Sequence, residues 1–567
     1  MTELFSRLLP ARYRFWVACI FLATLFACMA YMTDKAGWIG SALFFTMLSL
    51  VGWIDYRQPH QAIRRNYPVL AHFRFFFEYI RPEMRQYFVE SESEELPFSR
   101  AQRSIVYQRS KQDGDKRPFG TLLDVYSPHY EWINHSITPA HIDSHDFRIP
   151  IGGPACTQPY SASVFNISAM SFGALSAHAI QALNAGAQRG GFYHDTGEGS
   201  ISRYHLMHGG DLVWEIASGY FGCRNENGGF DPEKFATQAR LPQVKMIEIK
   251  LSQGAKPGHG GVLPAAKVTP EIAEARGIPL GQDCVSPATH SAFSTPLELM
   301  AFVSQLRELS GGKPVGIKLA IGHPWEWFAI VKAMLATDNT PDFIVIDGGE
   351  GGTGAAPLEF TDHVGAPLRD ALMLAHNTLV GANLRDRIRI GVAGKIITAF
   401  DMARALAMGA DWCNSARGFM FSLGCLQARV CHTGDCPTGV TTQDPRRMRA
   451  LDVKDKTARV HQFHRNTLIA LKELLAAAGL THPDELGPRH VIRRVSETEV
   501  QSLATLHRWA KPGELLGADD ATHASDASRH VLFRAFWQSA HPESFSIPDD
   551  LMAAHELWRS HTMPANR

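Results

Sequence analysis

The alternation of short apolar segments with amphipathic ones, from about residue 160 onward, constrains the fold of this chain more than any other feature. Amphipathic segments such as Trp325–Ala336 and Phe400–Met408 are predicted to be helices. The segments predicted to be β-strands are rich in Val and Ile or otherwise apolar: Lys245–Lys250, Pro314–Leu319, Asp342–Asp347, Arg387–Val392 and Asp411–Ser415. Strand, helix and strand in succession indicate parallel strands with helical crossovers. A span of roughly 300 residues favours an α/β fold of the TIM (β/α)8 barrel type, with a doubly wound sheet as the alternative.

Two uncharged apolar runs, Phe15–Met32 and Gly37–Ile54, occupy most of the first sixty residues. A helix of about 18 residues spans about 27 Å, close to the thickness of a bilayer core. Six arginines flank the pair on its outer sides: Arg7, Arg12, Arg14, Arg57, Arg64 and Arg65. The connecting turn carries no net charge, so we predict a transmembrane hairpin with both ends in the cytoplasm of a bacterial-type inner membrane. A cleaved signal peptide followed by one anchor and a buried soluble hairpin are the alternatives.

The overall composition excludes some classes of protein. Lys plus Arg (56) equals Asp plus Glu (56), so net charge gives no argument for a nucleic-acid partner, and none is expected. Nine cysteines in 567 residues are too few for a disulfide scaffold. The predicted organisation is a hairpin over 1–60, a connecting or covering region over 61–155, a barrel over 156–485, and a helical tail over 486–567.

Lys318 interrupts a predicted strand that is otherwise apolar, and a glycine-rich loop follows the next predicted strand. An unpaired buried ammonium is costly, so Lys318 must be paired or functional, and barrel chemistry lies at the C-terminal ends of strands. Gly349–Gly354 matches G-x-G-x-x-G after a strand, but Ala355–Pro357 follows where a dinucleotide fold needs a helix. A loop in which Gly351 and Gly352 let a flat ring or substrate approach the backbone fits better.

Two consecutive strand ends carry small residues before a helix. They are Gly391–Gly394 and Ser415–Gly418. This pattern predicts a phosphate held by backbone N–H groups near Gly394 and Ala416, with Arg417 adding charge.

Three of the nine cysteines, Cys425, Cys431 and Cys436, lie within twelve residues and are followed by a proline. Zinc sites favour closer pairs and four ligands, whereas this spacing is typical of iron–sulfur loops. Three thiolates suit a 3Fe–4S cluster best. A 4Fe–4S cluster with an open or foreign ligand stays possible, with Cys413 and His432 as extra candidates. Ordinary core cysteines are the alternative.

The chain closely resembles the FMN-binding synthase domain of glutamate synthase over about residues 160 to 490. The motifs that carry the resemblance include Ser168–Ser176, Asp195–Gly199, Ile216–Gly222, Glu248–Gly258, Gly348–Pro357 and the cysteine loop with the Pro437–Asp444 stretch. The resemblance implies a barrel that binds FMN and a 3Fe–4S cluster. It also implies that the reduced flavin converts 2-iminoglutarate, formed from 2-oxoglutarate and ammonia, to L-glutamate.

The resemblance assigns roles to individual positions. Lys250, Lys256 and Gln253 would face the carboxylates of 2-oxoglutarate, and with Lys318 they are the catalytic candidates. The residues implied beside the flavin are Met170, Ser171, Thr196, Ser218, Gln253 and Lys318. Those implied beside its phosphate are Gly394, Ala416 and Arg417.

Departures from the family pattern limit the assignment. The chain starts with Met-Thr-Glu-Leu rather than the family's cysteine nucleophile, so we expect no glutaminase domain and ammonia from solution or a partner subunit. His259 stands where the family usually has Glu. A flavin oxidoreductase for another amino or keto acid, or an electron-transfer subunit of a membrane complex, are the alternatives. We find no convincing nicotinamide site in the sequence, so a donor protein and a quinol both stay open as electron source.

Overall fold

The computed structural model describes four stretches of the chain: 10–91, 96–114, 116–517 and 536–552. The chain divides into two compact units, Met1–Arg100 and Ala101–Arg567, which we describe separately. Arg7 and much of the predicted tail lie outside the described residues.

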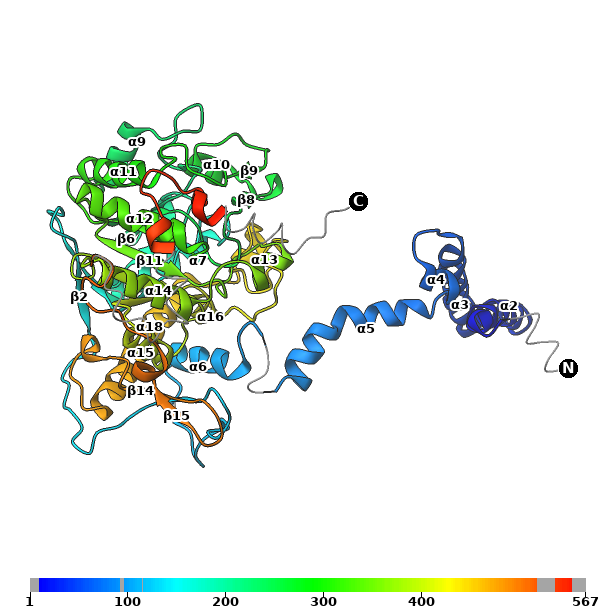
Figure 1. Cartoon of the computed structure of the whole chain (residues 1–567). Helices are drawn as coiled ribbons and strands as arrows, with labels where there is room; N and C mark the ends of the chain where they lie inside the picture. Colours follow the sequence, from blue (N-terminus) through cyan, green and yellow to red (C-terminus); the bar gives the residue numbers. More distant parts are fainter. Residues whose placement is uncertain (1–9, 92–95, 115, 518–535, 553–567) are drawn as a thin grey trace, which may run out of the picture. The chain divides into compact units, whose positions relative to one another are not determined.

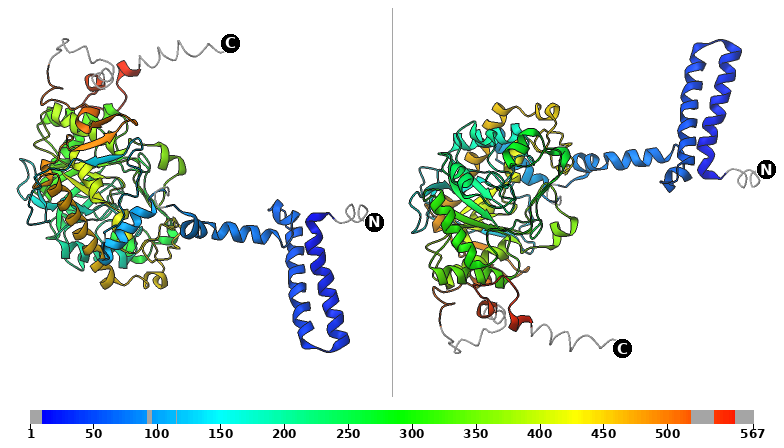
Figure 2. Two further views of the ribbon diagram at one scale, coloured as in Figure 1. Left: turned by 90° about the horizontal axis from the view of Figure 1, so that it is seen from below. Right: turned by 90° about the horizontal axis from the view of Figure 1, so that it is seen from above.

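Two long helices dominate the first unit. Helices α2 (Arg14–Thr33) and α3 (Ala36–Arg57) match the two predicted helices and run antiparallel (Figure 2). Trp16 Nε1 donates to the Ser49 carbonyl at 3.0 Å across the pair. Both helices are long and apolar enough to cross a membrane, and only 6% of each apolar window is buried. Their placement in a membrane stays a prediction, because length and composition are the only support for it.

Shorter helices complete the first unit: η1 (Ala11–Tyr13), α4 (Ala62–Asn66), α5 (Ala71–Met84) and the π-helical η2 (Arg85–Val89). Asp55 joins α3 to the start of α5, because its carboxylate accepts from Val69 N at 3.0 Å and contacts His72 Nε2 at 2.9 Å.

A closed barrel of eight parallel strands forms the centre of the second unit (Figure 1). In barrel order the strands are β4 (Phe165–Ile167), β5 (His194–Asp195), β6 (Leu212–Ile216), β7 (Val244–Lys250), β10 (Val315–Leu319), β11 (Phe343–Asp347), β12 (Arg389–Ala393) and β13 (Trp412–Ser415). The register places Lys318 opposite Lys250. The predicted TIM-type barrel is confirmed, and the five strands predicted from sequence are β7 and β10–β13.

Helices cover the outside of the barrel and connect successive strands (Figure 1). The longer ones are α7 (Ala177–Gly190), α9 (Pro232–Ala239), α11 (Pro296–Leu309), α12 (Pro324–Thr337), α14 (Leu368–Gly381), α15 (Ala399–Ala407) and α18 (Val453–Ala477). Local sequence fixes their starts: the Thr398 hydroxyl accepts from Asp401 N, and the Asp401 carboxylate reaches back to Thr398 N. The predicted helices over 325–336 and 400–408 correspond to α12 and α15.

Short elements fill the loops of the barrel. They are α8 (Arg203–Leu206), β8 (Val262–Leu263), η3 (Ala265–Lys267), α10 (Pro270–Arg276), β9 (Cys284–Val285), α13 (Leu358–His363), α16 (Arg417–Ser422) and α17 (Pro445–Met448). Before the barrel lie α6 (Arg100–Lys111) and the hairpin β2 (Arg148–Ile151) and β3 (Tyr160–Ser163).

The segment after residue 485 differs from the helical tail predicted for it. Its described part forms strands β14 (Val491–Arg494) and β15 (Val500–Ser502), which join β1 (Glu131–Ile133) in a three-stranded antiparallel sheet. Helices η4 (Pro483–Glu485) and α19 (Leu503–Leu506) flank it. β14 pairs locally with β15, and its other edge pairs with β1, which lies far away in the sequence, so part of this sheet depends on tertiary contacts.

Candidate functional site

A pocket of about 360 Å³ lies where barrel strands β5, β6 and β7 end. Its lining residues come from the loops that follow these strands: Glu198, Ser218, Lys250, Leu251, Ser252, Gln253, Lys256, Gly258, His259, Gly260, Gly261, Pro287 and Ala288. Four of the predicted site residues, Ser218, Lys250, Gln253 and Lys256, are therefore brought together. The C-terminal end of the strands is where barrel enzymes hold their substrates.

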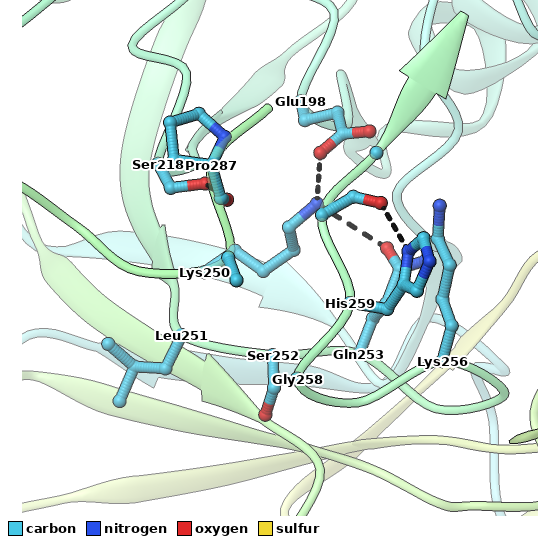
Figure 3. A pocket seen from close by; sticks show the side chains of 13 residues that line it. Glu198, Ser218, Lys250, Leu251, Ser252, Gln253, Lys256, Gly258, His259 and Pro287 are labelled. Atoms are coloured by element: carbon cyan, nitrogen blue, oxygen red, sulfur yellow. Dashed lines mark hydrogen bonds and ion pairs between the residues drawn. The ribbon is translucent and has the colours of Figure 1, made fainter. Parts of the chain in front are cut away.

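Lys250 lies at the centre of the pocket, between Glu198 and Gln253 (Figure 3). Its ammonium is 2.7 Å from Glu198 Oε2, 3.4 Å from Gln253 Oε1 and 3.2 Å from Glu215 Oε1. Burial raises the pKa of Glu198, but Lys250 outweighs it and lowers that pKa to about 2. The pair is therefore an ionised carboxylate and ammonium, and an incoming anionic ligand competes with Glu198 for Lys250.

Lys256 is the second cation of the pocket. Burial lowers the pKa of its ammonium, and the nearby Glu198 partly restores it. A Cβ atom at Gly261 would collide with Glu198 Oε1, so a larger residue there would displace this carboxylate. His259 Nδ1 lies 2.8 Å from the Gly260 carbonyl, on the same wall. Two cations and an amide around one cavity suit a ligand with carboxylates.

Lys318 lies in the barrel interior and is 4% exposed. Its ammonium is 2.7 Å from Glu215 Oε2 and 3.6 Å from Glu248 Oε1. Burial lowers the pKa of Lys318, but Glu215, Glu248 and Asp195 raise it well above the ordinary value. Lys318 is thus a paired, permanently charged group, as a lysine in a buried strand must be.

Glu215 connects the two lysines, since one carboxylate oxygen faces Lys318 and the other faces Lys250. Its backbone N–H donates to Thr196 Oγ1 at 3.2 Å. The predicted residues Met170 and Thr196 are buried, and Thr196 contacts this network. A Cβ atom at Gly197 would lie 2.7 Å from Ser171 N, so the chain packs tightly there.

The glycine-rich loop after β11 contacts Arg417, and the short helix α13 begins only after Pro357. Arg417 Nη2 donates to the Thr353 carbonyl at 2.8 Å. A Cβ atom at Gly352 would lie 3.4 Å from Arg417 Nε, and one at Gly351 would lie 2.9 Å from the Gly348 carbonyl. Glycine at position 351 therefore allows the close approach to the Gly348 carbonyl, and Gly352 lies in van der Waals range of Arg417.

The predicted phosphate positions lie at the ends of neighbouring strands β12 and β13. Gly394 has φ +149°, which favours glycine, and follows β12 directly. Ala416 is the N-cap of α16, and Ser415 Oγ donates to the Ile396 carbonyl at 2.6 Å, which ties the two strand ends together. Small residues at two adjacent strand ends, with a buried ammonium nearby in the barrel, make a donor set that fits a flavin phosphate and ring.

Cys425, Cys431 and Cys436 line a second cavity, about 250 Å³ in volume. Burial raises the pKa of Cys425 to about 11; in Cys436, bonds to Thr438 and Thr441 outweigh burial and lower it. In the described chain, the three sulfur atoms do not all lie within 4.8 Å of one another, as ligands of one small ion would. Three thiols around one cavity suit a multi-atom cluster better than a single zinc ion.

Two cationic side chains contact Cys431. Lys267 Nζ donates to its carbonyl at 2.9 Å, and Arg417 Nη1 lies 4.0 Å from its sulfur. Among the predicted extra ligands, Cys413 is buried on β13 and does not line the cavity, and neither does His432.

Glu198, Glu215 and Glu248 are site residues that the sequence analysis did not name individually. Glu215 stands in a strand that is otherwise apolar, as Lys318 does, whereas β7, which carries Glu248, also holds Lys245 and Lys250. The argument that marked Lys318 therefore applies directly to Glu215. A search for charges inside apolar strands would have found Glu215.

The barrel, its pocket and the cysteine loop lie in a region that is similar to known proteins. The family model described as "Conserved region in glutamate synthase" matches residues 153–481. The glutamate synthase large subunit-like protein YerD of Bacillus subtilis is 37% identical over 81% of this chain and 95% of its own length. The archaeal glutamate synthase [NADPH] of Methanocaldococcus jannaschii is 36% identical over 59% of this chain, which spans 62% of that relative.

Solved structures share the barrel only distantly. A mutant flavocytochrome b2 with pyruvate bound covers 80% of this chain and 91% of its own, at 12% identity and a TM-score of 0.40. The matched family region coincides with the barrel, its pocket and the cysteine loop, so the chain belongs to the glutamate synthase family and is an oxidoreductase of that type.

Proposed function

We propose that the chain is a membrane-anchored FMN and iron–sulfur oxidoreductase that reduces 2-iminoglutarate to L-glutamate. The observation that carries the proposal is the pocket in which Lys250, Lys256 and Gln253 surround one cavity at the end of β7. The nitrogen comes from ammonia, either in solution or supplied by a partner subunit. The electron donor is a protein or a membrane quinol.

The two lysines of the pocket bind the dicarboxylate. Lys256 and Lys250 attract its carboxylates, and Gln253 orients it by hydrogen bonding. To admit a carboxylate, Lys250 loosens its contact with Glu198, and Glu215 keeps the lysine in place from the other side. At Lys250 the ion pair that forms with substrate thus replaces one already present, which limits the cost of desolvation.

FMN would be held near Lys318, with its phosphate at Gly394 and Ala416. When bound, it supplies hydride transfer to the imine carbon. Lys318 would hold a positive charge beside the flavin. Met170, Ser171, Thr196 and Ser218 would surround the flavin. The three cysteines would hold a 3Fe–4S cluster, beside which Arg417 joins the cysteine loop to the glycine-rich loop.

The apolar pair α2 and α3 supports the membrane anchor, with its basic flanks on the cytoplasmic side. A second candidate function is the reduction of a different keto acid or imine. His259 favours it, because this residue lines the pocket where the resemblance leads us to expect Glu.

The deciding experiment is anaerobic. The purified full chain should be yellow-brown, release FMN and give a cluster signal in electron paramagnetic resonance. After reduction, 2-oxoglutarate with ammonia should reoxidise it faster than any other keto acid in a panel. Preference for another keto acid selects the second candidate, and a colourless protein with zinc in the cysteine loop overturns both.

A further inference from the structure

The barrel interior contains a group of carboxyl side chains that the proposed binding site does not use fully. Asp195, Glu215 and Glu248 are 2%, 2% and 1% exposed. They come from neighbouring strands β5, β6 and β7, and one carboxylate oxygen of each lies within 4.8 Å of the others. Lys318 projects among them from β10.

The positive charges of Lys250 and Lys318 do not balance the negative charge of three ionised carboxyl groups. Lys318 and Lys250 both contact Glu215, at 2.7 and 3.2 Å. Glu248 Oε1 lies 3.6 Å from the Lys318 ammonium, and it accepts no hydrogen bond from any described residue. A buried carboxylate oxygen without a hydrogen bond is costly, whereas a protonated carboxyl can donate to a neighbouring carboxylate.

The surroundings favour the neutral form of one acid. Gly197 N donates to Asp195 Oδ1 at 3.0 Å, which suits a carboxylate at Asp195 and a proton on Glu248. The other ionisable groups around the pair are Glu198, Glu215, Lys250, Lys318, Asp347 and Tyr193. Burial raises the pKa of Asp195, opposed by Lys318 and supported by Glu215. Burial and the adjacent Asp195 raise the pKa of Glu248.

We propose that Asp195 and Glu248 form a buried proton-binding pair that shares one proton near neutral pH. Two carboxyl groups this close in a low-dielectric interior do not both ionise. Binding of the proton forms one O–H bond and its release breaks that bond, without oxidation or reduction of the protein. The charge beside Lys318 therefore changes by one unit with the occupancy of the pair, and on the proposed function this change compensates for charge that appears on a bound flavin.

Infrared spectroscopy of the full chain tests the pair directly. A protonated carboxylic acid has a carbonyl stretch separate from carboxylate bands, and this stretch shifts in heavy water. The wild type should show it near neutral pH and lose it as the pH rises. Glu248→Gln and Asp195→Asn should each abolish it, because the remaining acid ionises beside Lys318. Glu198→Gln is the matched control and should keep it, since Glu198 is already ionised.

Isotope labelling avoids dependence on variants that fail to fold. In wild-type protein, 13C-labelled glutamate should move the band, with a smaller effect from labelled aspartate. No band in the wild type, or an unchanged band in both pair variants, overturns the proposal. The measurement needs neither flavin nor turnover, so a protein that shows the band but reduces no keto acid sinks the proposed function alone.

Discussion

Two ion clusters in the second unit have opposite compositions. The inner cluster has three adjacent carboxyl groups on strands around Lys318. The outer cluster has one carboxylate, Glu131 of β1, contacted by three guanidinium groups: Arg369, Arg404 and Arg493. Burial raises the pKa of Glu131, but its arginines outweigh burial and lower it.

The difference separates a structural cluster from a reactive one. In the outer cluster every group keeps its ordinary charge, and the contacts join β1 and β14 to helices α14 and α15. In the inner cluster the acids outnumber the cations, so at least one of them must change its protonation. Perturbed groups of this kind gather at functional sites because chemistry requires them there.

The largest expected effect is that of Lys318→Met. It removes the cation from between three buried carboxyl groups, and breaking a buried ion pair costs about 3–5 kcal/mol. We expect a lower thermal midpoint together with a loss of activity of about 100-fold or more, because on the proposed function Lys318 supplies positive charge to the flavin site. Differential scanning calorimetry and steady-state rates measure the two effects. Near-normal activity would remove Lys318 from the reactive cluster.

Glu131→Gln should cost about 1–3 kcal/mol of unfolding free energy, because three guanidinium groups lose their charged partner. The arginines are partly exposed, at 38%, 21% and 17% of their side chains, which keeps the cost below that of Lys318→Met. Keto-acid turnover at low temperature should be unchanged. A drop in turnover without unfolding would show that the outer cluster is more than structural.

Lys256→Met tests substrate binding in the pocket that Lys256 lines. Loss of one charge-assisted hydrogen bond should raise the KM for 2-oxoglutarate about tenfold to 100-fold and leave kcat nearly constant. Lys245→Met is the matched control, because Lys245 also belongs to the β7 region but pairs with Asp211 and lines no part of the pocket. Equal effects of the two variants would contradict substrate binding by Lys256.

The smallest effect is on the pH dependence of stability. Glu131 has a lowered pKa, so its contribution is present above its ordinary value of 4.5 and is lost as the pH falls through the folded value. Glu248 has a raised pKa, so it destabilises the folded state at high pH, and this penalty is relieved as the pH falls. Thermal midpoints across pH should therefore fall less steeply in acid in Glu131→Gln, and change less near neutrality in Glu248→Gln, than in the wild type. Identical dependence of the thermal midpoint on pH in both variants would contradict the difference between the inner and the outer cluster.

Much of the barrel was predictable because its strands are continuous apolar runs. Strand β5 was not, since it has two residues, His194 and Asp195, and no periodicity to detect. Strand β6 (LVWEI) was missed although its composition is apolar. The sheet formed by β1, β14 and β15 depends on a pairing between distant segments, which local propensity does not encode.

The site was predictable in its residue types and less so in its pairing. Lys250 ends β7, Gln253, Lys256 and Ser218 lie in loops after strands, and all four meet in one pocket. That Glu215 serves both Lys250 and Lys318 could not be predicted, because strand order and register decide which side chains share the barrel interior.

Arg417 ties two loops with different tasks into one mechanical element. Its guanidinium holds the Thr353 carbonyl on one side and lies against the Cys431 sulfur on the other. A displacement of the cysteine loop at Cys431 would therefore act on the backbone of the glycine-rich loop at Thr353 through this one side chain.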